Sequence, residues 1–297
     1  MNHFGNVITA MITPFHADGS VDYEAAASLA TYLCAHGSDG VLVAGTTGEG
    51  ATLTEQEKLT LFTTIVDALG KKATVIANVG SNNTAQTIAF AQKAAKTGVD
   101  ALLVITPYYN KPNQAGCYAH FAAVAQAVSL PIILYNVPGR TGGKVEAQTV
   151  VRLARDFTNI VGIKEASGDL VAATVIARDT ADDFMLYSGE DNLTLPLLAV
   201  GGCGIISVAS HLIGPALQEM IGAYKQQDVT KACRLHQQLL DVCNGVFCTV
   251  NPIPVKTCCH MLGLAEEVFR LPMVKASAAE KAFLRTMLEK AQIISPS

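Results

Sequence analysis

The stretch IVGIKEASGD, residues 160–169, holds a single lysine inside an apolar run of strand-forming residues and ends in a glycine-containing turn. Strand side chains alternate between two faces. One face carries Gly162, Lys164 and Ala166, and the other carries Val161, Ile163 and Glu165. Lys164 therefore stands between two small residues, and its acidic neighbour Glu165 points the opposite way.

A lysine in this position loses hydration without gaining an adjacent anion, and desolvation lowers its pKa. A neutral amine can attack a carbonyl carbon and form a Schiff base. Buried lysines are usually ion-paired, however, and a lysine near a strand end can also extend its amine to solvent. The stretch alone leaves a reactive lysine and a structural lysine both open.

Outward from this stretch, apolar runs alternate with helical patterns. The apolar runs are residues 7–15, 41–45, 73–79, 101–106, 131–137, 161–166, 184–188 and 204–209. The helical patterns are residues 22–35, 54–69, a helix that begins at Thr84, and residues 115–128, 145–155, 170–178, 193–200 and 215–226. Strands that are apolar on both faces indicate a parallel sheet covered by helices. Eight such units predict an α/β fold, the (β/α)8 TIM barrel, with a doubly wound sheet as the alternative.

Two details refine the domain organisation. Thr54 and Glu57 have the spacing of a capping box at the start of the second helix. After about Asp228 the strand signal is lost, and three further helices are predicted. We expect a catalytic barrel over residues 1–228 and a helical segment over residues 229–297 packed on it, since no low-complexity linker separates them.

Composition narrows the class of protein. The chain has 297 residues, of which 50% are hydrophobic and 15% charged, and its net charge is −4. No run of Lys or Arg is present, so nucleic acid and anionic membrane surfaces are not expected as partners. The uncharged residues 192–218 are interrupted by Pro and Gly, which favours a buried helix, a turn and a strand over a membrane helix. No Lys or Arg precedes the first apolar run, so a cytoplasmic protein without a signal peptide is expected.

The cysteines follow no metal-binding pattern. Eight are scattered through the chain without CxxC spacing, and reduced thiols are the expectation. A zinc site in the C-terminal region is the alternative, built from Cys243, Cys248, Cys258, Cys259 and His260. Their spacing matches no standard ligand set, so no metal site is expected.

In a (β/α)8 barrel the site lies where the strands end at their carboxyl side. GTTGE, residues 45–49, offers free N–H groups and two hydroxyls ahead of a helix, which suits a small carboxylate, although a tight turn with a threonine cap is the alternative. YNVPGRTG, residues 135–142, places Tyr135 on the strand beside Lys164, where its hydroxyl is expected to reach the amine. Arg140 in the following turn can clamp a carboxylate with two hydrogen bonds. The vicinal tyrosines of TPYYNKP, residues 106–112, are typical of packing or interface positions.

The sequence lacks the motifs of several other enzyme classes. The sequence has no HExxH, no GxSxG and no dinucleotide fingerprint, and GRTGGKV falls short of a phosphate loop. A metal-dependent aldolase needs histidines clustered at strand ends, and none of the seven histidines has that position.

Seven motifs together resemble the Schiff-base pyruvate-lyase family, which includes N-acetylneuraminate lyase, and within it the dihydrodipicolinate synthases. They are GTTGE, TPYYNKP, YNVPGRTG, GIKEASGD, SGED (residues 188–191), GGCGIISV (residues 201–208) and NPIPVK (residues 251–256). Each is weak alone, but the ordered set runs from residues 8–14 to residues 270–273 and is highly specific.

The resemblance implies a reaction. Lys164 would form an imine with pyruvate, the imine would lose a methyl proton, and the resulting enamine would attack L-aspartate-4-semialdehyde. Ring closure by transimination would release the product of this step of diaminopimelate and lysine biosynthesis. Tyr135 would carry protons at the imine, and Thr46 would link it to Tyr109 in a relay to solvent. No cofactor is implied.

Binding roles and assembly follow from the same resemblance. Thr46 and Thr47 would hold the pyruvate carboxylate, and Arg140 the carboxylate of the semialdehyde. Gly189 and the backbone near Ile206 would line the pocket. The second loop tyrosine comes from a neighbouring subunit in this family, which implies a homo-oligomer, usually a dimer of dimers.

Two residues favour one branch of the family. Lyases acting on sialic acid usually carry Ser in place of Thr46 and lack the Gly-Arg-Thr-Gly turn. Arg140 therefore favours a short second substrate with its own carboxylate. A sibling aldolase that splits a sugar acid, and a catalytically silent barrel that binds a keto acid, remain as alternatives.

Family members inhibited by lysine have an interface pocket, whose equivalents here are Ala51, Lys58, Asn82, Gln86 and Tyr108. Those members carry His or an acidic residue in place of Lys58 and Glu in place of Gln86. Lys58 adds like-charge repulsion toward a lysine ligand, and Gln86 removes a countercharge. The sequence therefore predicts weak or absent inhibition by lysine.

Overall fold

The computed structural model describes residues 4–295, and in it eight parallel strands close into a barrel in sequence order. The strands are β1 (Val7–Ala10), β2 (Gly40–Val43), β3 (Thr74–Asn78), β4 (Ala101–Ile105), β5 (Ile132–Asn136), β6 (Ile160–Glu165), β7 (Met185–Ser188) and β8 (Gly204–Ser207). Strand β8 pairs with β1, which closes the ring and leaves no sheet edge. The predicted (β/α)8 barrel is confirmed.

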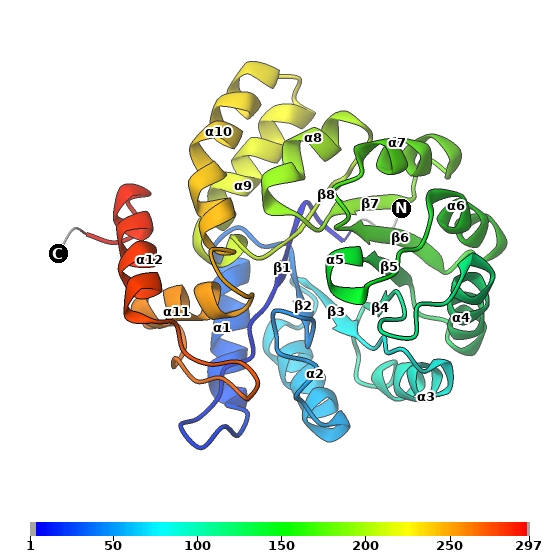
Figure 1. Ribbon diagram of the computed structural model, residues 1–297, viewed down its shortest axis with the longest axis horizontal. Helices are drawn as coiled ribbons and strands as arrows, with labels where there is room; N and C mark the ends of the chain where they lie inside the picture. The colour runs from blue at the N-terminus through cyan, green and yellow to red at the C-terminus, as the bar shows by residue number, and fades with distance from the viewer. Residues whose placement is uncertain (1–3, 296–297) are drawn as a thin grey trace.

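Helices surround the barrel and separate its strands along the chain (Figure 1). They are α1 (Tyr23–Ala35), α2 (Glu55–Leu69), α3 (Thr84–Ala94), α4 (Gln114–Ala127), α5 (Pro138–Thr141), α6 (Ala147–Asp156), α7 (Leu170–Asp179), the 3-10 turn η1 (Asp191–Leu193), α8 (Thr194–Ala199) and α9 (Ser210–Lys225). Three more follow: α10 (Val229–Gly245), α11 (Ile253–Met261) and α12 (Ala278–Lys290).

Two hydrophobic clusters hold this arrangement together. A large one joins the outer faces of the strands to the helices, and a small one fills the barrel interior. The interior cluster includes Ile8, Leu42, Ile76, Leu103, Tyr135, Tyr187 and Ile206. Because alternate strand residues supply the two clusters, each strand is apolar on both faces, which is the pattern that predicted the parallel sheet.

Helix α2 begins as predicted. The Thr54 hydroxyl accepts a hydrogen bond from the Glu57 N–H at 3.2 Å, and the Glu57 carboxylate accepts one from the Thr54 N–H at 2.8 Å. This capping box satisfies two N–H groups that a helix start would otherwise leave unpaired.

Other element boundaries differ from the prediction. Helix α9 begins at Ser210 and not at Pro215, and an irregular Ile213 (φ −131°) marks the kink before the proline. A single helical turn, α5, occupies residues 138–141, where a simple turn was expected, and it carries Arg140.

The predicted alternation fails at Val161. The pairing register between β5 and β6 shifts after Ile132, so that Ile132 pairs with Ile160 and Ile133 pairs with Gly162. Val161 therefore packs against the interior cluster, while Ile163 packs outside the barrel. A bulge of this kind adds one residue on one strand and changes which face the next side chains occupy. From Gly162 onward the alternation is as predicted.

The three predicted C-terminal helices are confirmed. Helix α10 packs along α9, and α12 packs against α10 and α11 on the same side of the barrel (Figure 1). The division between domains at residue 228 stays a prediction. Residues 192–218 form η1, α8, β8 and the start of α9. Within residues 4–295 no helix is long and apolar enough to cross a membrane.

Candidate active site

A cavity of about 410 Å³ opens at the carboxyl ends of the strands. Its lining includes six of the residues proposed from the sequence: Thr46, Thr47, Tyr135, Arg140, Lys164 and Gly189. They come from the loop after β2, from β5 and α5, from β6 and from the loop after β7. The barrel therefore brings together side chains that lie more than a hundred residues apart in the sequence.

Lys164 is 5% exposed and points into this cavity from β6. Tyr135 on β5 is its register partner, and the lysine Nζ lies 4.6 Å from the centre of the tyrosine ring. No salt bridge of Lys164 occurs in the described part of the chain. The aromatic face and the lack of an ion pair agree with a reactive lysine and disfavour the structural alternative.

Burial is the main cause that lowers the pKa of Lys164, to about 8. The carboxylates of Asp191 and Glu190 oppose this shift, and the Arg140 guanidinium adds to it. These two carboxylates were not foreseen from the sequence, although neither forms a salt bridge with the amine. Glu165 does point away, because its carboxylate accepts hydrogen bonds from the Asn136 amide at 3.0 Å and the Ser167 N–H at 2.7 Å.

Tyr135 is 7% exposed, and burial raises the pKa of its phenol to about 12. Arg140 and a hydrogen bond with the Thr46 hydroxyl act in the opposite direction. Tyr135 is therefore a neutral phenol at neutral pH, and its side chain is hydrogen-bonded to Thr46. A phenol hydrogen-bonded to a second hydroxyl can pass a proton along that pair.

Gly189 has a steric reason for its position. A Cβ at this residue would lie 3.1 Å from the Lys164 Cε and 2.6 Å from the Ala166 Cβ. Any side chain would press against Lys164, so only glycine leaves room for a ligand beside it. Ile206 is fully buried in the barrel interior and does not line the cavity. Val208, two residues further along the chain, lines it instead.

Two acidic residues of the site carried no role in the sequence analysis. Glu190 lines the cavity, and burial raises the pKa of its carboxyl. Asp191 is buried and accepts hydrogen bonds from the Ser207 hydroxyl and from the N–H groups of Val208 (3.0 Å) and Ala209 (3.2 Å). Both lie in the SGED motif, but the hydrogen bond of Asp191 with Ser207 of β8 and the effect of the two carboxylates on Lys164 depend on the closed barrel.

Tyr109 lies apart from the other proposed catalytic residues. It is 88% exposed, has a left-handed backbone (φ +70°) and does not line the cavity of its own chain. Its N–H donates to the Thr141 carbonyl at 3.2 Å, which ties its loop to α5. An exposed tyrosine held on an ordered loop is available to a second subunit.

The Dihydrodipicolinate synthetase family model matches residues 3–291 of the chain. The chain belongs to this family. It is 49% identical to the 4-hydroxy-tetrahydrodipicolinate synthase of Moorella thermoacetica, covering 98% of this chain and 99% of the relative. It is 52% identical to that of Heliobacterium modesticaldum, covering 96% and 95%.

Solved structures of family members superimpose closely. The enzyme from Cyanidioschyzon merolae with lysine bound has a TM-score of 0.96 and 46% identity, over 98% of this chain and 99% of that chain. The chloride inhibited dihydrodipicolinate synthase from Acinetobacter baumannii, complexed with pyruvate, has a TM-score of 0.95 and 37% identity, over 98% of this chain and 100% of that chain. Family and fold are thus supported by both sequence and structure.

A second cavity of about 370 Å³ adjoins the first in this family member. Ala51, Lys58 and Tyr108 line it, and it shares Thr46 and Arg140 with the first cavity. Burial lowers the pKa of Lys58, whose Nζ lies 5.5 Å from the centre of the Phe90 ring.

The other two proposed regulatory equivalents lie outside that lining. The Asn82 carbonyl accepts a hydrogen bond from the Asn110 amide at 2.9 Å, and Gln86 is exposed on the first turn of α3.

The cysteines are free thiols, and Cys258 and Cys259 are buried whereas Cys248 is exposed. Across residues 4–295, no group of three or more His, Cys, Asp or Glu side chains is arranged to hold a metal ion.

Proposed function

We propose that the protein is a lyase of the 4-hydroxy-tetrahydrodipicolinate synthase type, which condenses pyruvate with L-aspartate-4-semialdehyde. The observation that carries the proposal is the unpaired, buried Lys164 amine, with its lowered pKa, beside Tyr135 in the cavity. An amine of this kind suits imine formation with a keto acid. The named relatives, at about half identity over nearly the whole chain, support the same substrates.

Lys164 is the nucleophile in the first step and the leaving group in the last. Its neutral amine attacks the pyruvate ketone, and loss of water gives an imine. Removal of a methyl proton gives an enamine, whose carbon attacks the aldehyde of the second substrate. The α-amine of that substrate then displaces Lys164 by transimination and closes the ring. Tyr135 and Thr46 would exchange the protons of these steps, because their hydroxyls are in contact.

Carboxylate recognition is divided between two loops. Thr46 and Thr47 would hold the pyruvate carboxylate, and Arg140, which is exposed at the cavity mouth, would hold the carboxylate of the semialdehyde. We further propose that Tyr109 completes the relay in a neighbouring subunit of a dimer, with two dimers associating. A cytoplasmic location, without nucleic-acid or membrane partners, belongs to the same proposal.

The experiment that tests the function combines trapping with turnover. Borohydride with pyruvate should reduce the imine and leave a stable adduct on Lys164, located by peptide mass spectrometry. Coupled turnover of pyruvate with L-aspartate-4-semialdehyde should follow. A missing adduct would favour a silent keto-acid binder. An adduct without this turnover would favour a sibling aldolase, which product analysis with other aldehydes identifies.

Arg140→Ala should raise the KM for the semialdehyde at least about tenfold, since a charge-assisted bidentate contact of roughly 1.5–3 kcal/mol is lost. Turnover should fall, and imine formation with pyruvate should continue. Steady-state kinetics with the semialdehyde and borohydride trapping with pyruvate measure the two effects separately. Arg155→Ala, at an exposed arginine on α6, is the matched control. Equal kinetics for Arg140→Ala and this control would defeat the assignment.

The initial rate of imine formation should rise with pH and level off above about pH 8. Only the neutral amine attacks, and the pKa of Lys164 lies at about 8 against an ordinary 10.5. At pH 7 about a tenth of the amine is then neutral, against fewer than one in a thousand for an ordinary lysine. Stopped-flow trapping of pyruvate at several pH values measures the midpoint. A midpoint near 10 would contradict the role given to burial.

Lysine should inhibit the enzyme weakly or not at all. Lys58 lines the second cavity in place of the His or acidic residue of the inhibited members, and Gln86 provides no countercharge to a lysine ligand. Titration of lysine into the coupled assay measures this, and Lys58→His is the informative variant, expected to increase sensitivity. Strong inhibition of the parent enzyme by micromolar lysine would overturn the expectation.

A further inference from the structure

Three side chains of one C-terminal segment contact one loop of the catalytic barrel. We call residues 251–270 the clamp segment and residues 45–53, which follow β2, the carboxylate loop. Asn251, Lys256 and Arg270 of the clamp segment each bond to the carboxylate loop or to the capping box that ends it. These contacts join parts of the chain about two hundred residues apart.

Lys256 and Glu49 form a salt bridge that is almost fully enclosed, with side chains 0% and 2% exposed. Lys256 also donates to the Val268 carbonyl at 2.9 Å, and the Arg270 N–H donates to the second Glu49 oxygen at 3.1 Å. Breaking such a pair from one side leaves an uncompensated buried charge. The carboxylate loop is thus held at Glu49 by two separate points of the clamp segment.

The loop conformation requires such support. Glu49 has a left-handed backbone, with φ +51°, which is uncommon for a residue with a side chain. On its two sides the loop is pressed against β-strand ends: a Cβ at Gly48 would lie 2.9 Å from the Met11 carbonyl oxygen, and a Cβ at Gly50 would lie 2.0 Å from that of Ala44. The Glu49 N–H also donates to the Thr46 carbonyl at 3.1 Å, so the charged partners add to the turn's own hydrogen bonds in holding this conformation.

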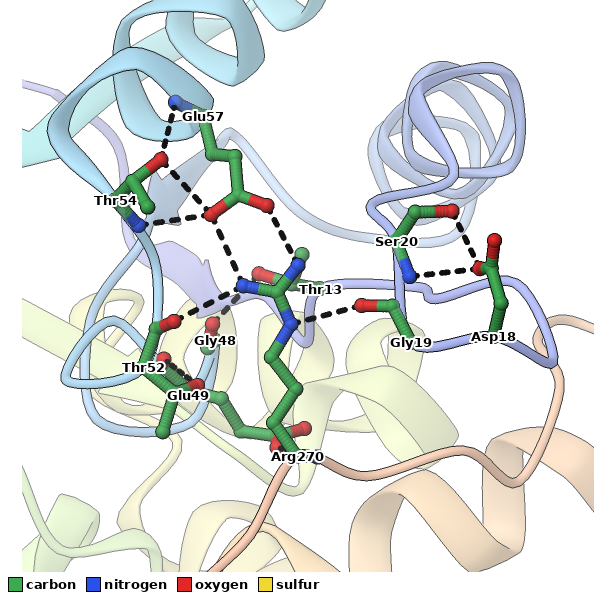
Figure 2. Close-up of polar contacts among 10 residues, drawn as sticks. All are labelled: Thr13, Asp18, Gly19, Ser20, Gly48, Glu49, Thr52, Thr54, Glu57 and Arg270. Atoms are coloured by element: carbon green, nitrogen blue, oxygen red, sulfur yellow. Dashed lines mark hydrogen bonds and ion pairs between the residues drawn. The ribbon is translucent and has the colours of Figure 1, made fainter.

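Arg270 extends the contact to the end of the loop. Figure 2 shows its guanidinium between the Glu57 carboxylate, the Thr52 carbonyl and the Gly19 carbonyl. It donates to both Glu57 oxygens at 2.9 and 2.6 Å, to Thr52 at 2.9 Å and to Gly19 at 2.8 Å. Because Glu57 is also the capping box of α2, one arginine fixes both the loop and the helix that follows it.

Asn251 reaches the ligand-binding hydroxyl itself. Its Nδ2 donates to the Thr47 Oγ1 at 3.0 Å, and both residues are buried in the lining of the catalytic cavity. Since Thr47 Oγ1 accepts this hydrogen bond, its own hydrogen is available to a ligand acceptor such as a carboxylate. Asn251 therefore orients the hydroxyl as well as placing it.

We infer that the clamp segment is a positioning device for the pyruvate carboxylate, with Asn251 acting through Thr47, and Lys256 and Arg270 acting through the backbone of the carboxylate loop. The inference rests on the proposed function, because it concerns where the pyruvate carboxylate binds. It gives the segment beyond the barrel a part in substrate binding and not only in stability.

Lys256→Met tests the buried pair. The concentration of pyruvate that gives half-maximal borohydride trapping on Lys164 should rise at least about tenfold. Lys281→Met is the matched control, because Lys281 pairs with the buried Glu267 at 2.6 Å in the same C-terminal region without bonding to the carboxylate loop. Its half-maximal concentration should stay within twofold of the parent. Equal values for both variants would overturn the inference.

A double-mutant cycle with Asn251 and Thr47 tests the inference even if Lys256→Met does not fold. Asn251→Ala should raise the half-maximal pyruvate concentration at least about fivefold in the parent, and should have no further effect in a Thr47→Val background. A purely structural asparagine would weaken trapping equally in both backgrounds, which would overturn the inference. Absence of any adduct in the parent enzyme would instead refute the proposed function, so the two failures are distinguishable.

Discussion

Lys164→Met is expected to lose at least about 10³-fold in kcat for the condensation, a loss of roughly 4 kcal/mol of transition-state stabilisation. The variant keeps an unbranched side chain of similar length in the cavity but has no amine to form the imine. Borohydride with pyruvate should leave no adduct. The coupled assay with the purified variant measures the residual rate, and a loss of less than tenfold would refute the covalent role of Lys164.

The same variant should gain stability at neutral pH. The pKa of Lys164 is about 8 in the folded protein and 10.5 in an unfolded chain. The unfolded state therefore holds the proton more tightly, and the cost to folding is fully present below about pH 8 and disappears as the pH rises to 10.5. The methionine variant avoids a cost of up to roughly 3 kcal/mol at pH 7.

Urea unfolding at pH 7 and at pH 10.5 checks this, with the parent protein as reference. The stability difference should be large at the lower pH and small at the higher. An inactive but stabilised variant shows that the activity is lost with the amine and not through unfolding. A variant that is less stable than the parent at pH 7 would contradict the burial argument.

Most of the fold was predictable because its signals are local. Eight apolar runs with helical patterns between them favour a closed parallel barrel over a doubly wound sheet, and the barrel is what forms. The bulge at Val161 was not predictable, since the register of β6 is set by its partner β5 and both neighbours of Val161 are themselves apolar or small. Likewise, no local sequence signal predicts the helical turn that begins at Ser210, before Pro215. Helix α9 packs against β1, and this tertiary contact favours the earlier start.

The candidate site was predictable where its residues end a strand. Lys164, Tyr135 and Thr46 met this condition, and they line one cavity. Asn251 does not end a strand, and its partner Thr47 lies 204 residues away in the sequence. Its part in the site was therefore not predicted, although the NPIPVK motif that begins with it was noticed. Its part in the site depends on the packing of helices that follow the barrel.

The electrostatic interactions of the site were harder to predict from the sequence than its residues. Asp191 is buried and hydrogen-bonded to the Ser207 hydroxyl and to the N–H groups of Val208 and Ala209, and its charge acts on Lys164. Sequence spacing gives the order of these groups but not their separation. For the same reason the lowered pKa of Lys164 could be predicted in direction from its small neighbours, while the opposing effect of the two carboxylates could not.

Tyr135→Phe is expected to lower kcat about 10²–10⁴-fold, the range for loss of a positioned proton carrier. The phenylalanine ring keeps the aromatic face that lies 4.6 Å from the Lys164 amine, so the site retains its shape. Because burial raises the pKa of Tyr135 to about 12, the missing group is a neutral hydroxyl bonded to Thr46 and not a phenolate. The pyruvate adduct should therefore still form, but more slowly, at every pH from 6 to 9.

Tyr187→Phe is the matched control for this prediction. Tyr187 is the register partner of Lys164 on β7, is fully buried in the barrel interior, and donates its hydroxyl to the Gly5 carbonyl at 2.8 Å. Its removal should cost about 1 kcal/mol of stability and change kcat less than threefold. Stopped-flow trapping and steady-state turnover of both variants separate the two roles. If the two variants lose activity equally, the hydroxyl of Tyr135 is a structural group and the proton must reach the imine by another route.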